Sequence, residues 1–214
     1  MRATLLTSVI AVAFSNMCLA QEWEVGAAAG YGFYNNASIG DPVTGLSASA
    51  GFHPGFAVGA FFGENMYEHV GGELRYLFFW GAPELQFQNT RASMRGYTNL
   101  VVYDVLVHMK TRDSNVRPYL AAGAGIKVFT GTSTQVLAQP LAEFAVLRPL
   151  QQVEPAISVG GGLKFRVATH ALLRADFRTY MSPLPNHLFR PTGFSEIRGW
   201  VYNFVPQVGI GYTF

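Results

Sequence analysis

Serine and histidine side chains that hydrolysis would require occur together at two places along the chain. Ser47 and Ser49 lie close to His53, and Ser182 lies close to His187. A serine nucleophile needs a base within hydrogen-bond reach and a carboxylate that orients the base. Neither place has a His-x-Ser spacing, and loops are naturally rich in serine. We interpret both groups as loop polarity and predict that the protein is not an enzyme and has no catalytic residues.

The sequence also gives little support for metal binding or thiol chemistry. The five histidines stand singly along the chain, without the close spacing of a zinc site. The one cysteine is Cys18, which lies in a segment that we expect to be removed. Disulfides and thiolate chemistry are then excluded from the remaining chain. We predict no metal site and no cofactor.

The first twenty residues read as a cleavable secretory signal peptide, covering residues 1–20. Arg2 supplies the positive start, residues 4–14 form an apolar run, and Cys18-Leu19-Ala20 offers small residues for cleavage. The predicted partner of this segment is the export machinery. Lipidation of Cys18 is the alternative, although Ser15-Asn16-Met17 lacks the residues that such a signal prefers. A single domain of residues 21–214 would follow.

Composition indicates how that domain is solvated. Half of the residues are hydrophobic and 13% are charged, about half the charged fraction of a soluble domain. Without Arg2, 14 Lys and Arg face 13 Asp and Glu, which argues against a nucleic-acid partner. After Ala20 no apolar run approaches the roughly 18 residues of a membrane-spanning helix. A closed barrel is the other structure that pairs every backbone polar group within a bilayer.

Alternation of apolar residues with small or polar ones predicts the strands of that barrel. The clearest segment is 70–80, where Leu74 and Tyr76 share one face while Glu73 and Arg75 share the other. The other predicted strands are 23–34, 55–63, 97–109, 119–129, 157–167, 173–178 and 207–214. The fold class is therefore all-β, a transmembrane eight-stranded antiparallel up-and-down barrel. A soluble lipocalin-like barrel would instead place such charges outside.

Connection lengths predict the orientation. Segments 35–54, 81–96, 130–155 and 182–198 are long and would be extracellular, while the turns between them are short and would be periplasmic. Aromatic residues gather at the long-loop ends of strands, as an interfacial girdle would. Pro206 cannot donate to a strand ladder, so we expect a bulge near it or pairing only beyond it.

Ionisable residues at the inward positions predict what fills the lumen. They are Glu24, Glu73, Arg75, Asp104, His108, Lys127, Lys164, Arg166, Arg174, Asp176 and Arg178. Eight strands enclose a space that side chains just fill, and buried charges need partners. We predict an ion-pair and hydrogen-bond network. The alternative is a narrow anion-leaning channel, because six inward Lys and Arg exceed four Asp and Glu.

Several short motifs together resemble the small outer-membrane barrels of the OmpA/OmpX type. They include Gly59-Ala60-Phe61-Phe62-Gly63, Gly72-Glu73-Leu74-Arg75-Tyr76, Arg117-Pro118-Tyr119, Asp176-Phe177-Arg178 and the terminal Gly211-Tyr212-Thr213-Phe214. The resemblance covers nearly all of residues 21–214 and implies an integral location in the bacterial outer membrane. It also implies that the barrel-assembly machinery reads Val208, Ile210, Tyr212 and Phe214, although Phe214 is equally explained as a lipid-facing residue.

The predicted function is that of a non-enzymatic integral outer-membrane β-barrel that contributes to envelope integrity or to surface interaction through its extracellular loops. Gln86-Phe87-Gln88-Asn89 with Arg91 and Arg95 is mildly basic and would suit lipopolysaccharide, or it is an ordinary solvated loop. Outer-membrane lipid is the other expected partner, and we expect a monomer. The narrow channel and, by resemblance, a lipid A acyl hydrolase or transferase using Ser47 or His53 are the alternatives.

Overall fold

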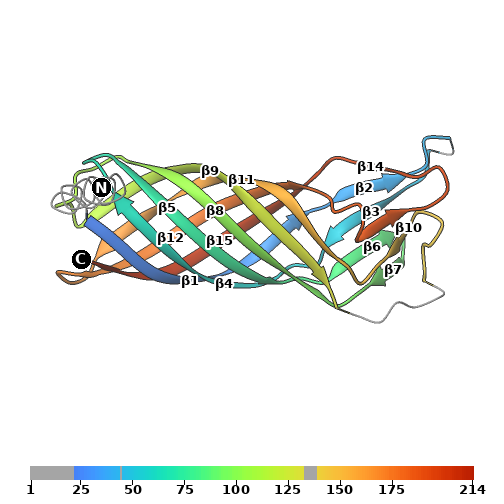
Figure 1. The fold of residues 1–214 in the computed structure, drawn as a ribbon, viewed down its shortest axis with the longest axis horizontal. Helices are drawn as coiled ribbons and strands as arrows, with labels where there is room; N and C mark the ends of the chain where they lie inside the picture. The colour runs from blue at the N-terminus through green and yellow to red at the C-terminus, as the bar shows by residue number, and fades with distance from the viewer. Residues whose placement is uncertain (1–21, 44, 133–138) are drawn as a thin grey trace, which may run out of the picture.

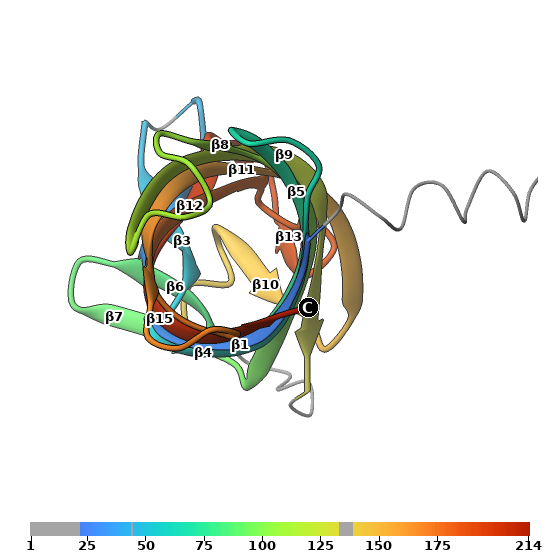
Figure 2. The ribbon, with the colours of Figure 1, turned by 90° about the vertical axis from the view of Figure 1, so that its left-hand side faces the viewer.

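The protein is described here by a computed structural model that covers residues 22–43, 45–132 and 139–214. The predicted signal peptide, residues 1–20, lies outside this range. Eight long strands form a closed antiparallel barrel in the order β1-β15-β12-β11-β9-β8-β5-β4 (Figures 1 and 2). Their bounds are β1 Glu22–Asn35, β4 Gly55–Asn65, β5 Val70–Trp80, β8 Gly96–His108, β9 Val116–Gly131, β11 Gln151–Arg166, β12 Ala171–Pro183 and β15 Trp200–Thr213. Within the described residues, no helix is long and apolar enough to cross a membrane.

The predicted fold class is confirmed, and its two faces follow the alternation of the sequence. On β5, Leu74 and Tyr76 are 48% and 42% exposed, whereas Glu73 and Arg75 are each 1% exposed. Successive side chains of a strand point to opposite sides, so one parity meets lipid and the other fills the lumen. The outward positions of the other seven strands also carry exposed apolar residues, as Val105 on β8 and Ile157 on β11 illustrate.

Several strands are longer than predicted, mainly at the long-loop end. β11 begins at Gln151 rather than at 157 and contains Pro155, whose exposed side faces outward. β12 runs from Ala171 to Pro183 and β15 begins at Trp200. The exposure of successive side chains still alternates over this added length of the barrel wall.

Pro206 lies inside β15 without shifting the register. Phe177 of β12 pairs with Pro206 directly. On the other side, Gly30 pairs with Gln207 and Phe33 with Phe204, at an unchanged offset. Between these two pairs, Tyr31 and Gly32 of β1 pair with no residue of β15 in the described part of the chain, and the pairing of β1 with β15 resumes at the same offset. The expected bulge is therefore absent, and β15 pairs on both sides of the proline.

Seven short strands form a folded cap at the long-loop end. A five-stranded sheet has the order β14-β2-β3-β6-β7, and β10 pairs with β13 separately. Their bounds are β2 Ala37–Gly40, β3 Ser47–Phe52, β6 Pro83–Phe87, β7 Thr90–Ser93, β10 Ala145–Leu147, β13 Phe189–Pro191 and β14 Glu196–Arg198. The larger sheet continues five neighbouring barrel strands, and β10 lies within the outline of the barrel seen end-on (Figure 2).

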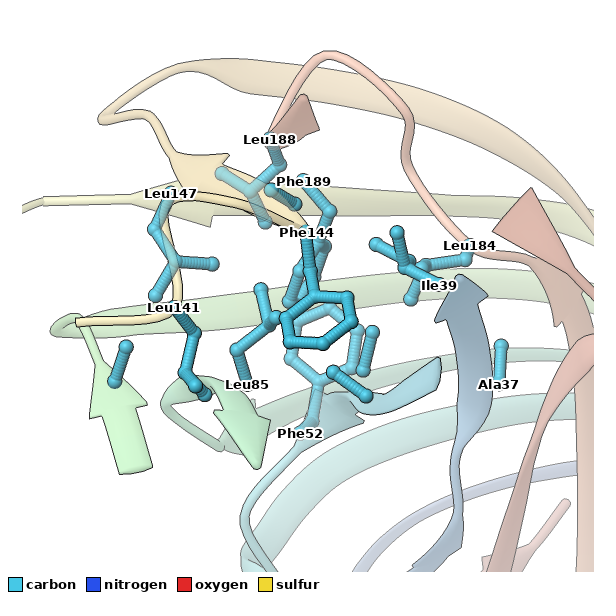
Figure 3. Packing of buried hydrophobic residues seen from close by; sticks show 14 of the residues in the cluster. Ala37, Ile39, Phe52, Leu85, Leu141, Phe144, Leu147, Leu184, Leu188 and Phe189 are labelled. Atoms are coloured by element: carbon cyan, nitrogen blue, oxygen red, sulfur yellow. The ribbon is translucent and has the colours of Figure 1, made fainter. Parts of the chain in front are cut away.

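The cap has an apolar core of its own (Figure 3). Phe52 stacks on Phe129 with ring centroids 4.7 Å apart and meets Phe189 edge-on at 5.7 Å. Ile39, Leu85 and Leu188 are each 0% exposed. Since Phe129 comes from barrel strand β9, this core joins the cap to the rim of the barrel. Parts of the long segments are thus folded into a core, whereas Gln88, Asn89 and Arg91 of the β6–β7 hairpin stay exposed.

Candidate functional site

A cluster of charged side chains crosses the lumen below the cap, and Glu73 of β5 lies at its centre. Glu73 forms ion pairs with Arg75 at 2.7 Å, with Arg174 at 2.5 Å and with Arg178 at 3.4 Å. All four side chains are at most 1% exposed. Alternation places each of them at a lumen position, and β12 supplies both Arg174 and Arg178.

Three further carboxylates extend this cluster, which we call the lumen network. Asp176 lies 2.9 Å from Arg75 and 3.4 Å from Arg174. Asp104 lies 2.8 Å from Arg178. Glu24 pairs with Arg174 at 3.1 Å and closely with Lys164. The network residues are Glu24, Glu73, Arg75, Asp104, Lys164, Arg174, Asp176 and Arg178.

Neutral side chains complete the network. The Arg75 guanidinium donates to Gln207 Oε1 at 2.8 Å, and that of Arg174 donates to the Tyr119 hydroxyl at 2.6 Å. The Tyr119 hydroxyl in turn donates to Asp176 Oδ1. The Arg174 guanidinium lies over the Phe61 ring, with Arg174 Cζ 4.2 Å from the ring centroid. The sequence pattern places Tyr119, Gln207 and Phe61 in the lumen, but it does not indicate that they join the charges.

Three of the predicted lumen residues do not join the network. Arg166 is exposed at the end of β11 and donates to the Arg112 carbonyl. His108 is 2% exposed, and neither of its ring nitrogens has a hydrogen-bond partner in the described part of the chain. Lys127 is 0% exposed, and its Nζ likewise has no partner there. That Nζ lies 5.2 Å from the Phe129 ring and 5.6 Å from the Tyr34 ring, just beneath the cap.

The network is balanced in charge, because four cations meet four carboxylates. The excess of inward cations in the sequence comes from Arg166 and Lys127, which lie outside it. Buried pairs of this kind are costly to break, because removal of one partner leaves an uncompensated charge. The arrangement therefore favours closure of the lumen over ion selectivity.

The serine and histidine candidates are not assembled into a hydrolytic site. Ser47 and Ser49 lie on β3, while His53 Nδ1 contacts the Pro54 carbonyl oxygen at 2.8 Å. Ser182 is buried in β12, and the backbone amide of His187 donates to Gln152. In the described part of the chain no hydrogen bond joins any of these serines to a histidine. The same part holds no group of three or more His, Cys, Asp and Glu residues that could bind a metal.

Comparison with solved structures identifies the architecture. Neisserial surface protein A matches with a TM-score of 0.55 and 14% identity, over 90% of this chain and 97% of that one. A major outer membrane protein from Thermus thermophilus matches with a TM-score of 0.56 and 14% identity, over 91% and 100%. OprG from Pseudomonas aeruginosa matches with a TM-score of 0.50 and 16% identity, over 91% and 96%.

The chain has the fold of small outer-membrane β-barrels. No protein family and no curated protein matches its sequence, so the likeness is one of structure. Neighbours with this fold are integral outer-membrane proteins, in agreement with the predicted location. Short turns face the periplasm in such barrels, so the predicted position of the cap is extracellular.

The residues of the predicted assembly signal lie on the lipid-facing side of this outer-membrane barrel. Val208, Ile210, Tyr212 and Phe214 are 67%, 58%, 52% and 60% exposed. Tyr212 stacks on His170 with ring centroids 5.5 Å apart. Their exposure leaves them open to a partner during assembly, and it equally suits contact with lipid.

Proposed function

We propose that the protein is a non-enzymatic integral outer-membrane barrel that is closed to solutes and supports a rigid surface outside the cell. The cap carries this proposal. Its apolar core lies at the outer mouth, above the charge-balanced lumen network. Its role is then envelope integrity or surface interaction through the cap.

The cap core and the lumen network both close the barrel, which is the physical reason to prefer this function to a channel. An ion needs a continuous polar path, whereas Phe52 and Phe189 of the cap core are 2% and 0% exposed. Below them, Arg75, Arg174 and Arg178 are all held by carboxylates. A permeating anion would have to displace those carboxylates from cations that are already satisfied.

Planar-bilayer recording tests the closed state. Purified protein, refolded and checked for heat-modifiable mobility, should give no discrete conductance steps. A trimeric porin added to the same bilayers controls for insertion. Reproducible steps from the folded monomer would contradict the proposal and support the narrow channel.

The cap surface also suits anionic sugars, which supports lipopolysaccharide as a partner. The β6–β7 hairpin presents Gln88, Asn89 and Arg91 to solvent. A separate groove of about 440 Å³ is lined by Arg148 and Arg190 together with Val146 and Thr192. Neither arginine forms an ion pair within the described residues. The phosphates of lipopolysaccharide are the expected ligands of such guanidinium groups.

Reconstitution tests this partner. Protein in nanodiscs with lipopolysaccharide should unfold at a higher temperature than protein in phospholipid nanodiscs, and Arg148→Gln with Arg190→Gln should reduce the difference. Glu143→Gln, at an exposed position of the cap, is the matched control. Equal unfolding temperatures in the two lipids would argue against the interaction. The export and barrel-assembly machineries are the other proposed partners, supported by the predicted signal peptide and by the exposed residues of β15.

A further inference from the structure

A polar pocket lies at the short-turn end of the barrel. Strand β1 begins and strand β15 ends at this end, as Figure 1 shows. Its lining includes Arg112, Arg117, Lys164 and Arg166, with Ser114 and Thr213. We call it the periplasmic pocket. Short turns of this fold face the periplasm, so the pocket lies at the opposite end from the cap and takes no part in the proposed surface interaction.

The three arginines of the periplasmic pocket are held by neutral acceptors. Arg117 donates to the Lys110 carbonyl at 3.1 Å, to Asn65 Oδ1 at 3.2 Å and to the Glu68 carbonyl at 2.6 Å. Arg112 donates to the Asn65 carbonyl at 2.7 Å, and Arg166 donates to the Arg112 carbonyl. These bonds fix the positions of the guanidinium groups without neutralising their charge.

No carboxylate of the described residues forms an ion pair with Arg112, Arg117 or Arg166, in contrast to the lumen network. Glu22 and Glu24 also line the pocket. Glu24 is already engaged by Lys164 and Arg174, and Glu22 forms no ion pair with the arginines. Four cations and two carboxylates line the pocket. The Glu68 carboxylate lies beside it and accepts from the Arg112 backbone amide at 2.9 Å, so the cations still outnumber the carboxylates.

One donor in this lining is buried and unused. Arg112 Nε is shielded from solvent and has no hydrogen-bond partner among the residues that the structure describes. A buried donor without an acceptor costs about 1–3 kcal/mol, and an acceptor with negative charge would relieve that cost. The Ser114 and Thr213 hydroxyls, which line the same pocket, are further donors.

From these observations we propose that the periplasmic pocket binds the terminal carboxylate of a soluble peptide. Arginine matches a carboxylate geometrically, because its planar donors pair with both oxygens. The cavity encloses about 20 Å³, room for little more than one water-sized group. Only a small terminal oxyanion fits, and the rest of the ligand extends into the periplasm.

The orientation of the lining favours a soluble ligand over a lipid headgroup. Glu24, Lys164 and Arg117 occupy lumen positions of their strands, where they are 1%, 5% and 6% exposed. Phospholipid headgroups surround the outside of the barrel, on the face that carries Tyr212 and Phe214. A ligand therefore enters along the barrel axis.

Solution NMR of the refolded protein in nanodiscs tests this site. The probe is N-acetyl-D-alanyl-D-alanine, added as the free acid or as its C-terminal amide, while the Arg112 side-chain Nε–H signal is followed. The free acid should shift this signal in a saturable manner and the amide should not. No shift with the acid, or equal shifts with both, would overturn the proposal. A shift produced by phosphatidylglycerol in the nanodisc, without the peptide, would assign the site to lipid instead.

Variants separate binding from folding. Arg112→Gln, followed through the backbone amide signals of Ser114 and Thr213 in the same pocket, should weaken binding of the free acid about tenfold, as expected for loss of one charged hydrogen bond. Arg91→Gln, at an exposed position of β7 in the cap, should bind like the parent protein. Should Arg112→Gln fail to fold, Ser114→Ala should also weaken binding of the free acid, followed through the Arg112 Nε–H signal. Unchanged affinity in every variant that folds would contradict the assignment.

Discussion

Arg174 on β12 pairs with Glu73 on β5 at 2.5 Å, although these strands lie on opposite sides of the barrel. Three strands separate them in either direction around the wall. The hydrogen-bonded ladder therefore does not bring them together. This ion pair crosses the lumen, and it links two opposite strands of the wall independently of the strand pairing.

Removing the Glu73 carboxylate from this ion pair should destabilise the barrel strongly. In Glu73→Gln, Arg174, Arg75 and Arg178 lose a shared negative charge within a buried space. Loss of one partner from a buried pair costs about 3–5 kcal/mol. Urea unfolding in lipid vesicles, followed by tryptophan fluorescence and by heat-modifiable mobility, measures the change.

Glu143→Gln provides the matched control, because Glu143 is exposed in the cap and forms no ion pair in the described residues. It should leave the free energy of unfolding within about 0.5 kcal/mol of the parent. A similarly small effect of Glu73→Gln would show that the lumen network adds nothing to stability.

The lipid-facing parity of β5 leads to a second prediction. Tyr76 pairs with Ala60 and Val101 of the neighbouring strands, and all three lie on the outward face. Tyr76→Arg should cost about 2–4 kcal/mol if the position lies near the bilayer midplane. Tyr76→Leu, which keeps an apolar side chain, should cost much less in the same vesicle unfolding experiment. Equal stability of the two variants would place Tyr76 outside the hydrocarbon.

Alternation explains how much of this architecture the sequence predicts. Lipid on one side of the wall and a narrow lumen on the other require apolar and polar residues to alternate. Alternation alone therefore predicts that Glu73 and Arg75 face the lumen and that Leu74 faces lipid. Parity does not say how far a side chain reaches. The contacts of Tyr119 and Gln207 with the charges, and the exposed position of Arg166 at a strand end, therefore emerge only in three dimensions.

The cap was not predictable in the same way. Ile39, Leu85 and Leu188 come from three different long segments, and where apolar and polar residues alternate there, as around Leu85, they do so over only a few positions. Each cap strand has three to six residues, too few for a periodic signal to be read. Only the packing of these segments against one another and against Phe129 creates a core.

A third prediction concerns that core. Phe52→Ala removes a ring that contacts Phe129 and Phe189, and such a change in a packed core costs about 3–5 kcal/mol. Since the lumen network does not depend on Phe52, the cap should open locally while the barrel remains folded. Limited proteolysis should cleave the cap segments of intact, heat-modifiable protein. Phe56→Ala, at a lipid-facing ring that is 69% exposed, should leave the cap resistant, and equal resistance of the Phe52 variant would argue against a cap held by its core.

The end of β15 provides the last prediction, which tests the assembly signal rather than stability. Phe214 is 60% exposed at the final position of the chain, and its backbone forms two hydrogen bonds of 3.0 Å with Trp23. If the assembly machinery reads this residue, deletion of Phe214 should lower the outer-membrane level of the protein in cells. The purified variant should nevertheless refold in vesicles with little loss of stability, because few contacts hold the ring. Phe194→Ala, at a cap residue that is 77% exposed, should assemble normally. Normal membrane levels without Phe214 would leave it as a lipid-facing residue alone, and equal losses in cells and in refolding would assign it a structural role.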